Sequence, residues 1–198
     1  MRNMRVAGAY VLIFFATQAP AADFSDPEWP CIQRKVEQLS IGLMWPGLLE
    51  PDRTGVAAHR QLAARLSQRR TRQAEAETAV MATKSSGAWN ASAAAAVFSD
   101  VFLRVSDQRQ KVIAGIKRYA TKQNALAEKI EALRGEMAVM SAAATPDFDR
   151  IDALEEQLDW EERIFRDRAK SLTYVCETPV LLEKHIYAVG QILRASAE

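Results

Sequence analysis

The feature that most constrains the fold is an apolar repeat that begins at Phe98 and continues to Met140. Steps of four and three residues, taken alternately, select thirteen positions, of which eleven are apolar: Phe98, Phe102, Val105, Arg109, Val112, Ile116, Tyr119, Gln123, Leu126, Ile130, Leu133, Met137 and Met140. A mean spacing of 3.5 residues held over so many turns is typical of a long helix in a left-handed coiled coil. At 1.5 Å per residue, a helix over 98–140 is about 65 Å long.

A helix of this length does not fit inside a compact globule made from this chain. A globular protein of similar size has a radius of gyration of about 16 Å, and hence a diameter of about 40 Å. We therefore expect an elongated molecule. The composition agrees with a helical fold, because the 198 residues include only 8 Gly and 7 Pro.

A second apolar stripe predicts the partner of the long helix. Residues 141–146 form a short break, in which Thr145 is a candidate cap and Pro146 suits the first turn of a new helix. Because a short connection makes two helices antiparallel neighbours, we expect a hairpin that turns near residue 144. The second stripe contains Ile151, Leu154, Leu158, Glu161, Phe165, Arg168, Leu172 and Val175.

Four polar residues occupy stripe positions in this hairpin: Arg109, Gln123, Glu161 and Arg168. With a turn near residue 144, the numbers of facing residues sum to roughly 288, so Gln123 is expected near Phe165 and Arg168. One interpretation is that these side chains reach out to solvent or fix the register of the coiled coil. The other is that they form a buried polar binding site.

The remaining segments complete an all-α fold: an elongated antiparallel coiled-coil hairpin with additional packed helices and an irregular N-terminal arm. The arm is assigned to residues 22–52, because Trp-Pro pairs hold the backbone there extended. Pro179 is expected to end or kink the helix that precedes it. The helical body comprises residues 53–198, with helices over about 53–83, 95–141, 146–177 and 180–196.

The first 21 residues match a secretory signal peptide. Arg2 and Arg5 precede an apolar run, and residues 19–21 (Ala-Pro-Ala) fit the small-x-small cleavage pattern. The apolar run is about half of the ~20 residues that a membrane span needs. We therefore expect a periplasmic or secreted protein with no membrane span after removal of the signal.

The chain contains two cysteines, Cys31 and Cys176. In an oxidising compartment two cysteines most often form one disulfide, which here would attach the arm to the hairpin. The rival interpretation is a metal-binding or redox pair of thiols. A structural disulfide is favoured, because the sequence has no Cys-x-x-Cys and no His within five residues of either cysteine.

Charge is distributed unevenly, although the net charge is only +1. Residues 53–72 include six Arg and no acidic residue, whereas residues 147–162 include eight acidic residues and Arg150. The balanced total argues against a general polyanion binder, so no nucleic-acid partner is expected. The favoured interpretation places the Arg-rich segment beside the acidic hairpin tip. The alternative is that this basic segment binds an external partner, since a basic helix can bind nucleic acid, phospholipid headgroups or an acidic protein.

The sequence carries no catalytic or cofactor signature. His59 and His185 lie on different expected helices, and neither is followed by a carboxylate at the spacing of a helical metal site. Nucleophile-elbow, dinucleotide-binding, phosphate-loop, zinc-protease and haem-attachment patterns are absent from the sequence. We therefore expect a non-enzymatic protein without catalytic residues, cofactor or metal.

Residues 29–40, Trp-Pro-Cys-Ile-Gln-Arg-Lys-Val-Glu-Gln-Leu-Ser, resemble the opening of a group of uncharacterised periplasmic proteins from proteobacteria. The shared pattern is Trp-Pro-Cys-x-Gln-x-Lys-Val. The resemblance implies a periplasmic location and brings with it no site residue.

These features predict a periplasmic helical scaffold, adaptor or assembly factor that binds another periplasmic or envelope protein. The alternative is a periplasmic protein that binds a small ligand or metal through the polar seam residues. An exposed apolar stripe on the hairpin favours the first hypothesis, and a cavity lined by Arg109, Gln123 and Arg168 favours the second. Trp160 bears on this choice: we expect it to pack on the first helix or the arm, but if exposed it is a partner-binding anchor.

Overall fold

The computed structural model describes residues 26–87 and 89–197, so the expected signal peptide lies outside the described part. All regular secondary structure in the described residues is helical. The elements are α1 (Ile41–Met44), the 3-10 helix η1 (Val56–His59), α2 (Arg60–Leu66), α3 (Gln73–Ser85), α4 (Ala91–Ser141) and α5 (Phe148–Ser196). Among these residues no helix has both the length and the apolar character that crossing a bilayer requires.

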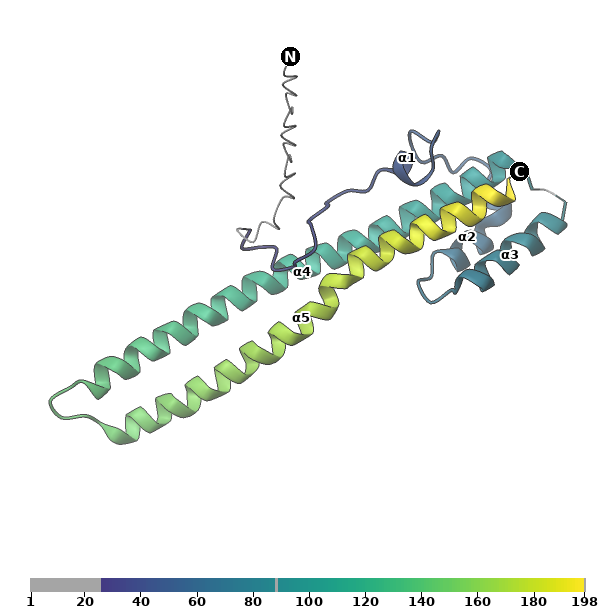
Figure 1. The fold of residues 1–198 in the computed structure, drawn as a ribbon. Helices are drawn as coiled ribbons and strands as arrows, with labels where there is room; N and C mark the ends of the chain where they lie inside the picture. Colours follow the sequence, from purple (N-terminus) through teal and green to yellow (C-terminus); the bar gives the residue numbers. More distant parts are fainter. Residues whose placement is uncertain (1–25, 88, 198) are drawn as a thin grey trace, which may run out of the picture.

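Helices α4 and α5 form the antiparallel hairpin that the sequence predicts (Figure 1). The 51 residues of α4 make a rod of about 76 Å at 1.5 Å per residue, so the molecule is elongated. Asn90 caps α4 by accepting a hydrogen bond from the amide of Ala93 (2.9 Å). Asp147 caps α5 through the amide of Arg150 (3.1 Å), so the cap is Asp147 and not Thr145.

The predicted register of the hairpin is confirmed. All thirteen stripe positions on α4 are buried or half-buried. Gln123 contacts Phe165, as the rule for facing residues requires. Gly190 lies directly against Phe98, where an added Cβ would stand 2.9 Å from the ring carbon Cε2. The seam is therefore aligned from its middle to the base, the end at which the two long helices meet α1–α3.

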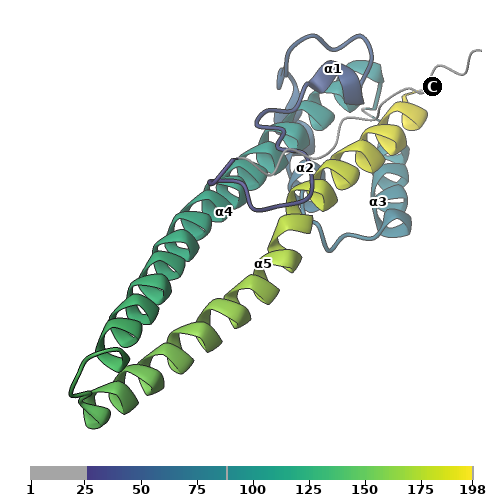
Figure 2. The same ribbon diagram turned by 60° about the vertical axis from the view of Figure 1, so that its left-hand side comes forward.

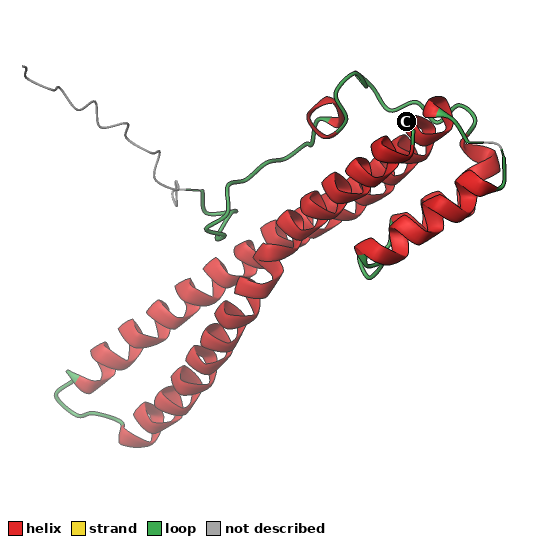
Figure 3. Cartoon of the chain, turned by 45° about the vertical axis from the view of Figure 1, so that its right-hand side comes forward, coloured by secondary structure: helices red, strands yellow, loops and turns green. Residues whose placement is uncertain are grey.

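The main core lies at this base, where the shorter helices pack against the hairpin (Figure 3). Trp45, just after α1, stacks on Phe98 with ring centroids 5.0 Å apart. The core brings together apolar side chains from every helix, among them Ile41, Val56, Leu62, Leu66, Val80, Val97, Val101, Val105, Leu182, Ile186 and Leu193. Towards the tip, α4 and α5 extend beyond this cluster.

The single helix predicted over 53–83 is wrong, because the structure divides this segment into η1, α2 and α3. After α2, the hydroxyl of Ser67 donates to the carbonyl of Ala63 (2.7 Å), and that of Thr71 donates to the carbonyl of Arg65 (2.9 Å). These bonds satisfy carbonyls at the helix end. Residues 67–72 thus form a turn, and α3 returns to the core in a new direction.

The expected helix boundary at Pro179 is also wrong, because α5 is one helix from Phe148 to Ser196. Proline has no amide hydrogen to donate to the carbonyl four residues before it, which usually bends a helix. The axis of α5 does change direction partway along its length (Figure 2). Pro179 itself is buried in the seam, and Leu182 and Ile186 continue the buried face beyond it. Packing on α4 therefore keeps the chain helical through the proline.

The Arg-rich segment does not meet the acidic tip. Helices α2 and α3 lie at the base, at the opposite end of the hairpin from the turn between α4 and α5 (Figure 1). Arg53 pairs instead with Asp100: Arg53 Nε lies 3.0 Å from the buried carboxylate, which accepts a hydrogen bond from Arg104 Nε (2.7 Å). The intramolecular pairing expected between residues 53–72 and 147–162 is therefore wrong.

Candidate functional site

The disulfide between Cys31 and Cys176 attaches the arm to α5. The two Cα atoms are 5.5 Å apart, and both cysteines are buried. They form a small satellite core with Trp29 on the arm and with Ile113 and Ile116 on α4. A disulfide indicates an oxidising, extracytoplasmic compartment.

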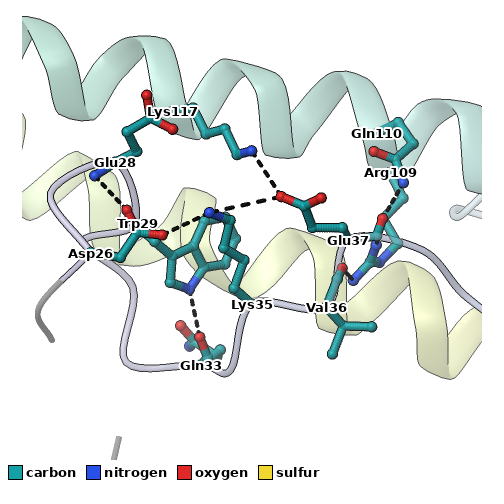
Figure 4. A network of polar contacts seen from close by, with 10 residues as sticks. All are labelled: Asp26, Glu28, Trp29, Gln33, Lys35, Val36, Glu37, Arg109, Gln110 and Lys117. Carbon is teal, nitrogen blue, oxygen red and sulfur yellow. Dashed lines mark hydrogen bonds and ion pairs between the residues drawn. The ribbon is translucent and has the colours of Figure 1, made fainter. Parts of the chain in front are cut away.

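A chain of ion pairs follows the arm across α4 (Figure 4). Lys35 Nζ lies 2.7 Å from Asp26 and 3.8 Å from Glu37. Glu37 also accepts from Lys117 Nζ on α4 (3.0 Å). The indole of Trp29 donates to the carbonyl of Gln33 (2.7 Å), which closes the loop that carries Cys31.

These contacts favour the charged forms of the arm residues. The hydrogen bond from Lys35 lowers the pKa of Asp26, and the bond to Asp26 raises the pKa of Lys35. The hydrogen bond from Lys117 lowers the pKa of Glu37. The pairs lie at the surface, where each contributes little stability, so their role is to set the path of the arm.

Arg109 joins three segments of the chain. Its side chain is 2% exposed, and its Nε donates to Glu183 on α5 (2.8 Å). The remaining two guanidinium nitrogens donate to the carbonyls of Val36 and Glu37 on the arm. All three nitrogens are thus bonded, which a buried guanidinium requires. The structure makes Arg109 an anchor for the arm and for the register of the hairpin.

Gln123 lies in the seam nearer the tip, where it lines a crevice beneath the arm. Its Nε2 donates to the carbonyl of Phe165 (2.8 Å), whereas its Oε1 is buried and has no hydrogen-bond partner among the described residues. Gln33 on the arm lines the same crevice and also has a buried Oε1 without a partner there. The crevice has a volume of about 420 Å³ and is bounded by the arm, α4 and α5.

The four polar residues predicted in the seam do not form one site. Arg109 and Gln123 are separated by two heptads, about 21 Å along α4. Glu161 is half-buried and pairs with Lys129 on α4. Arg168 is exposed, so it lies outside the seam. The crevice is lined by Gln123 but by neither Arg109 nor Arg168.

Sequence reasoning missed Gln33, which is the second amide of the crevice. An irregular arm has no periodicity from which the direction of a side chain can be inferred, and the contacts that fix this arm are made to residues far away in the sequence. The position of Gln33 two residues after Cys31 is the one signal that could have placed it near α5.

A separate exposed surface lies on the outer side of α5. Trp160 and Tyr174 are 61% and 76% exposed, and Leu181 is also exposed. These residues are separated by whole heptads and therefore share one side of the helix. The expectation that Trp160 packs on the first helix or the arm is wrong, because α2 and α3 lie at the base. Trp160 instead lines a surface hollow of about 510 Å³ on α5.

Several carboxylates that have no ion-pair partner in the described part of the chain lie on the first turns of α5, and two of them are beside Trp160. Among the described residues, no ion pair engages Asp149, Asp152, Glu155, Glu156 or Asp159. Two of them, Glu156 and Asp159, line the hollow beside Trp160, together with Arg163. The outer side of α5 therefore combines an exposed indole with carboxylates that outnumber the basic side chains beside it.

The described residues contain no group of three or more His, Cys, Asp and Glu side chains positioned to hold a metal ion. The chain matches no family model, no curated protein and no solved structure.

Proposed function

We propose that this protein is a non-enzymatic helical adaptor of the periplasm, which binds another envelope protein through the outer side of α5. The observation that carries the proposal is the exposed position of Trp160 in line with Tyr174 and Leu181. Exposed aromatic residues on a rigid helix are the side chains that most often dominate binding energy at protein interfaces.

The charge around Trp160 specifies the kind of partner. The uncompensated carboxylates near the start of α5 create a negative surface, which attracts a positively charged one. We therefore propose a partner that inserts an apolar group beside Trp160 and surrounds it with Lys or Arg. Binding should weaken as salt rises, because exposed charges are screened over about 10 Å at 0.1 M ionic strength.

The architecture suits this role because it holds the binding surface away from the main core. The base fixes the hairpin through its apolar core, Arg109 and the disulfide, and the two long helices carry Trp160 towards the tip. The periplasmic location is supported by the signal-like residues 1–21 and by the disulfide, which indicates an oxidising compartment.

The test is crosslinking from a defined position. A photoreactive phenylalanine analogue replaces Trp160 in one protein and Tyr187 in the other, since Tyr187 is an exposed aromatic residue on the same helix, near the base. Both proteins are irradiated in cells and recovered from the periplasmic fraction. We expect the protein with the photoreactive residue at position 160 to crosslink to one abundant partner. The protein with this residue at position 187 should not crosslink to that partner.

Alanine variants test how much Trp160 and Tyr174 contribute to binding of the partner. Trp160→Ala combined with Tyr174→Ala should lower the recovery of that partner at least tenfold, whereas Tyr187→Ala should leave it unchanged. Helical circular dichroism of all variants should equal that of the parent, because the substituted side chains are exposed. A partner recovered equally from both crosslinking positions, or equally by both variants, would overturn the proposal.

A further inference from the structure

We propose that the crevice beneath the arm binds a small, largely apolar molecule that carries a primary amide or amine. This site is distinct from the outer side of α5. It is formed by the arm around Cys31, the middle of α4 around Gln123, and the facing part of α5 from Phe165 to Glu177.

Two hydrogen-bond acceptors define the polar end of the ligand. Gln123 is 7% exposed, and neither its Oε1 nor that of Gln33 has a donor among the described residues. Buried acceptors in folded proteins almost always have a donor, because leaving one without a partner is costly. A primary amide or amine carries N–H groups, which are the donors that these oxygens lack.

Gln123 is also held in place to meet such a ligand. Its amide nitrogen donates to the carbonyl of Phe165, which fixes the side chain across the seam. The opposite atom of the amide, Oε1, is consequently the one left for a ligand. The two glutamine oxygens therefore favour a ligand with N–H donors over a carboxylate or an ester, which offers them none.

The rest of the wall defines the body of the ligand. It is lined mostly by apolar groups and by the disulfide, with Asn124 and Thr173 as further polar residues and the exposed Glu177 as its one ionisable side chain. A volume of about 420 Å³ lies within the range of small-molecule sites, about 300–1,000 Å³. The apolar lining residues include Pro30, Ile32, Ala120, Phe165, Ala169 and Leu172.

The crevice depends on the attached arm. Cys31 and Cys176 both line it, so the disulfide is part of its wall and also holds Gln33 above the seam. Release of the arm therefore removes one of the two acceptors and opens one side of the crevice. We therefore expect ligand binding to require the disulfide. Folding of the long hairpin should not require it.

The test uses two probes that differ in their donors. The full chain, with its disulfide intact, is titrated with 1-naphthamide and with methyl 1-naphthoate, which has the same ring system but no N–H. We expect saturable binding of the amide and at least tenfold weaker binding of the ester. Equal affinity for the two probes, or no binding of the amide up to millimolar concentration, would overturn the proposal.

Variants place the binding in the crevice. Gln123→Leu and Gln33→Leu should each weaken amide binding at least fivefold, while Gln108→Leu, an exposed position on α4, should have no effect. Cys31→Ser combined with Cys176→Ser should abolish binding and keep the helical circular dichroism. Since Gln33 lies on the arm, its variant stays informative if Gln123→Leu perturbs the seam. Unchanged affinity in both glutamine variants, or in the double cysteine variant, would contradict the site.

Discussion

Arg109 is held by partners from two segments, and both are needed because its guanidinium has almost no access to water. Glu183 on α5 supplies the charge, and the backbone of the arm supplies two further acceptors. The two members of the ion pair are unequal, since Arg109 is buried whereas the Glu183 side chain is 28% exposed. A carboxylate that loses its partner there can turn towards water, but the guanidinium cannot.

This asymmetry predicts different costs for removing the two members of the pair. Glu183→Ala should lower the free energy of unfolding by about 3 kcal/mol, because it leaves a buried charge without its counterion. Arg109→Leu should cost less, since the released Glu183 is solvated. The double variant Arg109→Leu with Glu183→Leu should recover most of the loss, because apolar replacement of a buried pair is often close to neutral. Denaturant unfolding of all three variants measures these differences, and equal losses in the two single variants would contradict the argument.

The residues predicted in the seam show what a sequence pattern can determine about a site. The apolar repeat correctly predicts that Gln123 lies beside Phe165, because both lie on long helices whose register follows from it. The prediction that Arg168 lies in the same seam is wrong. The departure is local, because Phe165 and Leu172 on either side of it stay half-buried and the heptad is buried again from Pro179 onward. The roles of Arg109 and Gln33 depend on the path of the arm, which no repeat encodes.

At the scale of elements, the two long helices were predictable and the shorter ones were not. A 3.5-residue repeat over 98–140 is a local signal of many turns, so individual polar positions do not obscure it. The segment 53–83 has a helical composition throughout, and its division at residues 67–72 depends on hydrogen bonds and on the position of the core. Pro179 likewise lies inside α5 because packing on α4 outweighs its local preference.

The close approach of α4 and α5 at the base depends on one glycine. An added Cβ at Gly190 would stand 2.9 Å from the ring of Phe98 and 3.4 Å from the carbonyl of Met44. Gly190→Ala should therefore destabilise the protein by about 1–3 kcal/mol, the usual cost of overpacking a core. Thermal or denaturant unfolding measures the effect.

Gly135 is the matched control, since it lies within α4 and no atom stands within 4 Å of an added Cβ. Gly135→Ala should stabilise the protein by about 0.5–1 kcal/mol, because alanine loses less backbone entropy in a helix. If both alanine variants were stabilising, the packing of α5 on Phe98 would be looser than the structure shows.

At the scale of the whole molecule, the stabilising contacts and the exposed aromatic surface around Trp160 lie in different parts of the rod. The base combines the main core, the disulfide and the arm contacts, whereas the tip is a two-helix seam. In the half towards the tip, the buried residues form only the narrow apolar seam between α4 and α5. They include Leu126, Ile130, Leu133, Ile151 and Leu154. The proposed adaptor surface lies on this less supported half, and the proposed ligand crevice lies where the two halves meet.

This separation predicts a gradient of amide hydrogen exchange along both long helices. Segments with few buried apolar contacts open locally at a lower free energy than the core does. Amides of α4 at 97–105, and of α5 at 182–193, should therefore exchange last, through global unfolding. Amides flanking the turn, at 134–141 and 148–155, should exchange fastest among the helical residues, and those near Gln123 should be intermediate. Exchange followed by mass spectrometry on peptides of the oxidised protein measures the gradient. Uniform protection from base to tip would show that the hairpin unfolds as one unit, and it would contradict the separation of the molecule into a more stable base and a less stable tip.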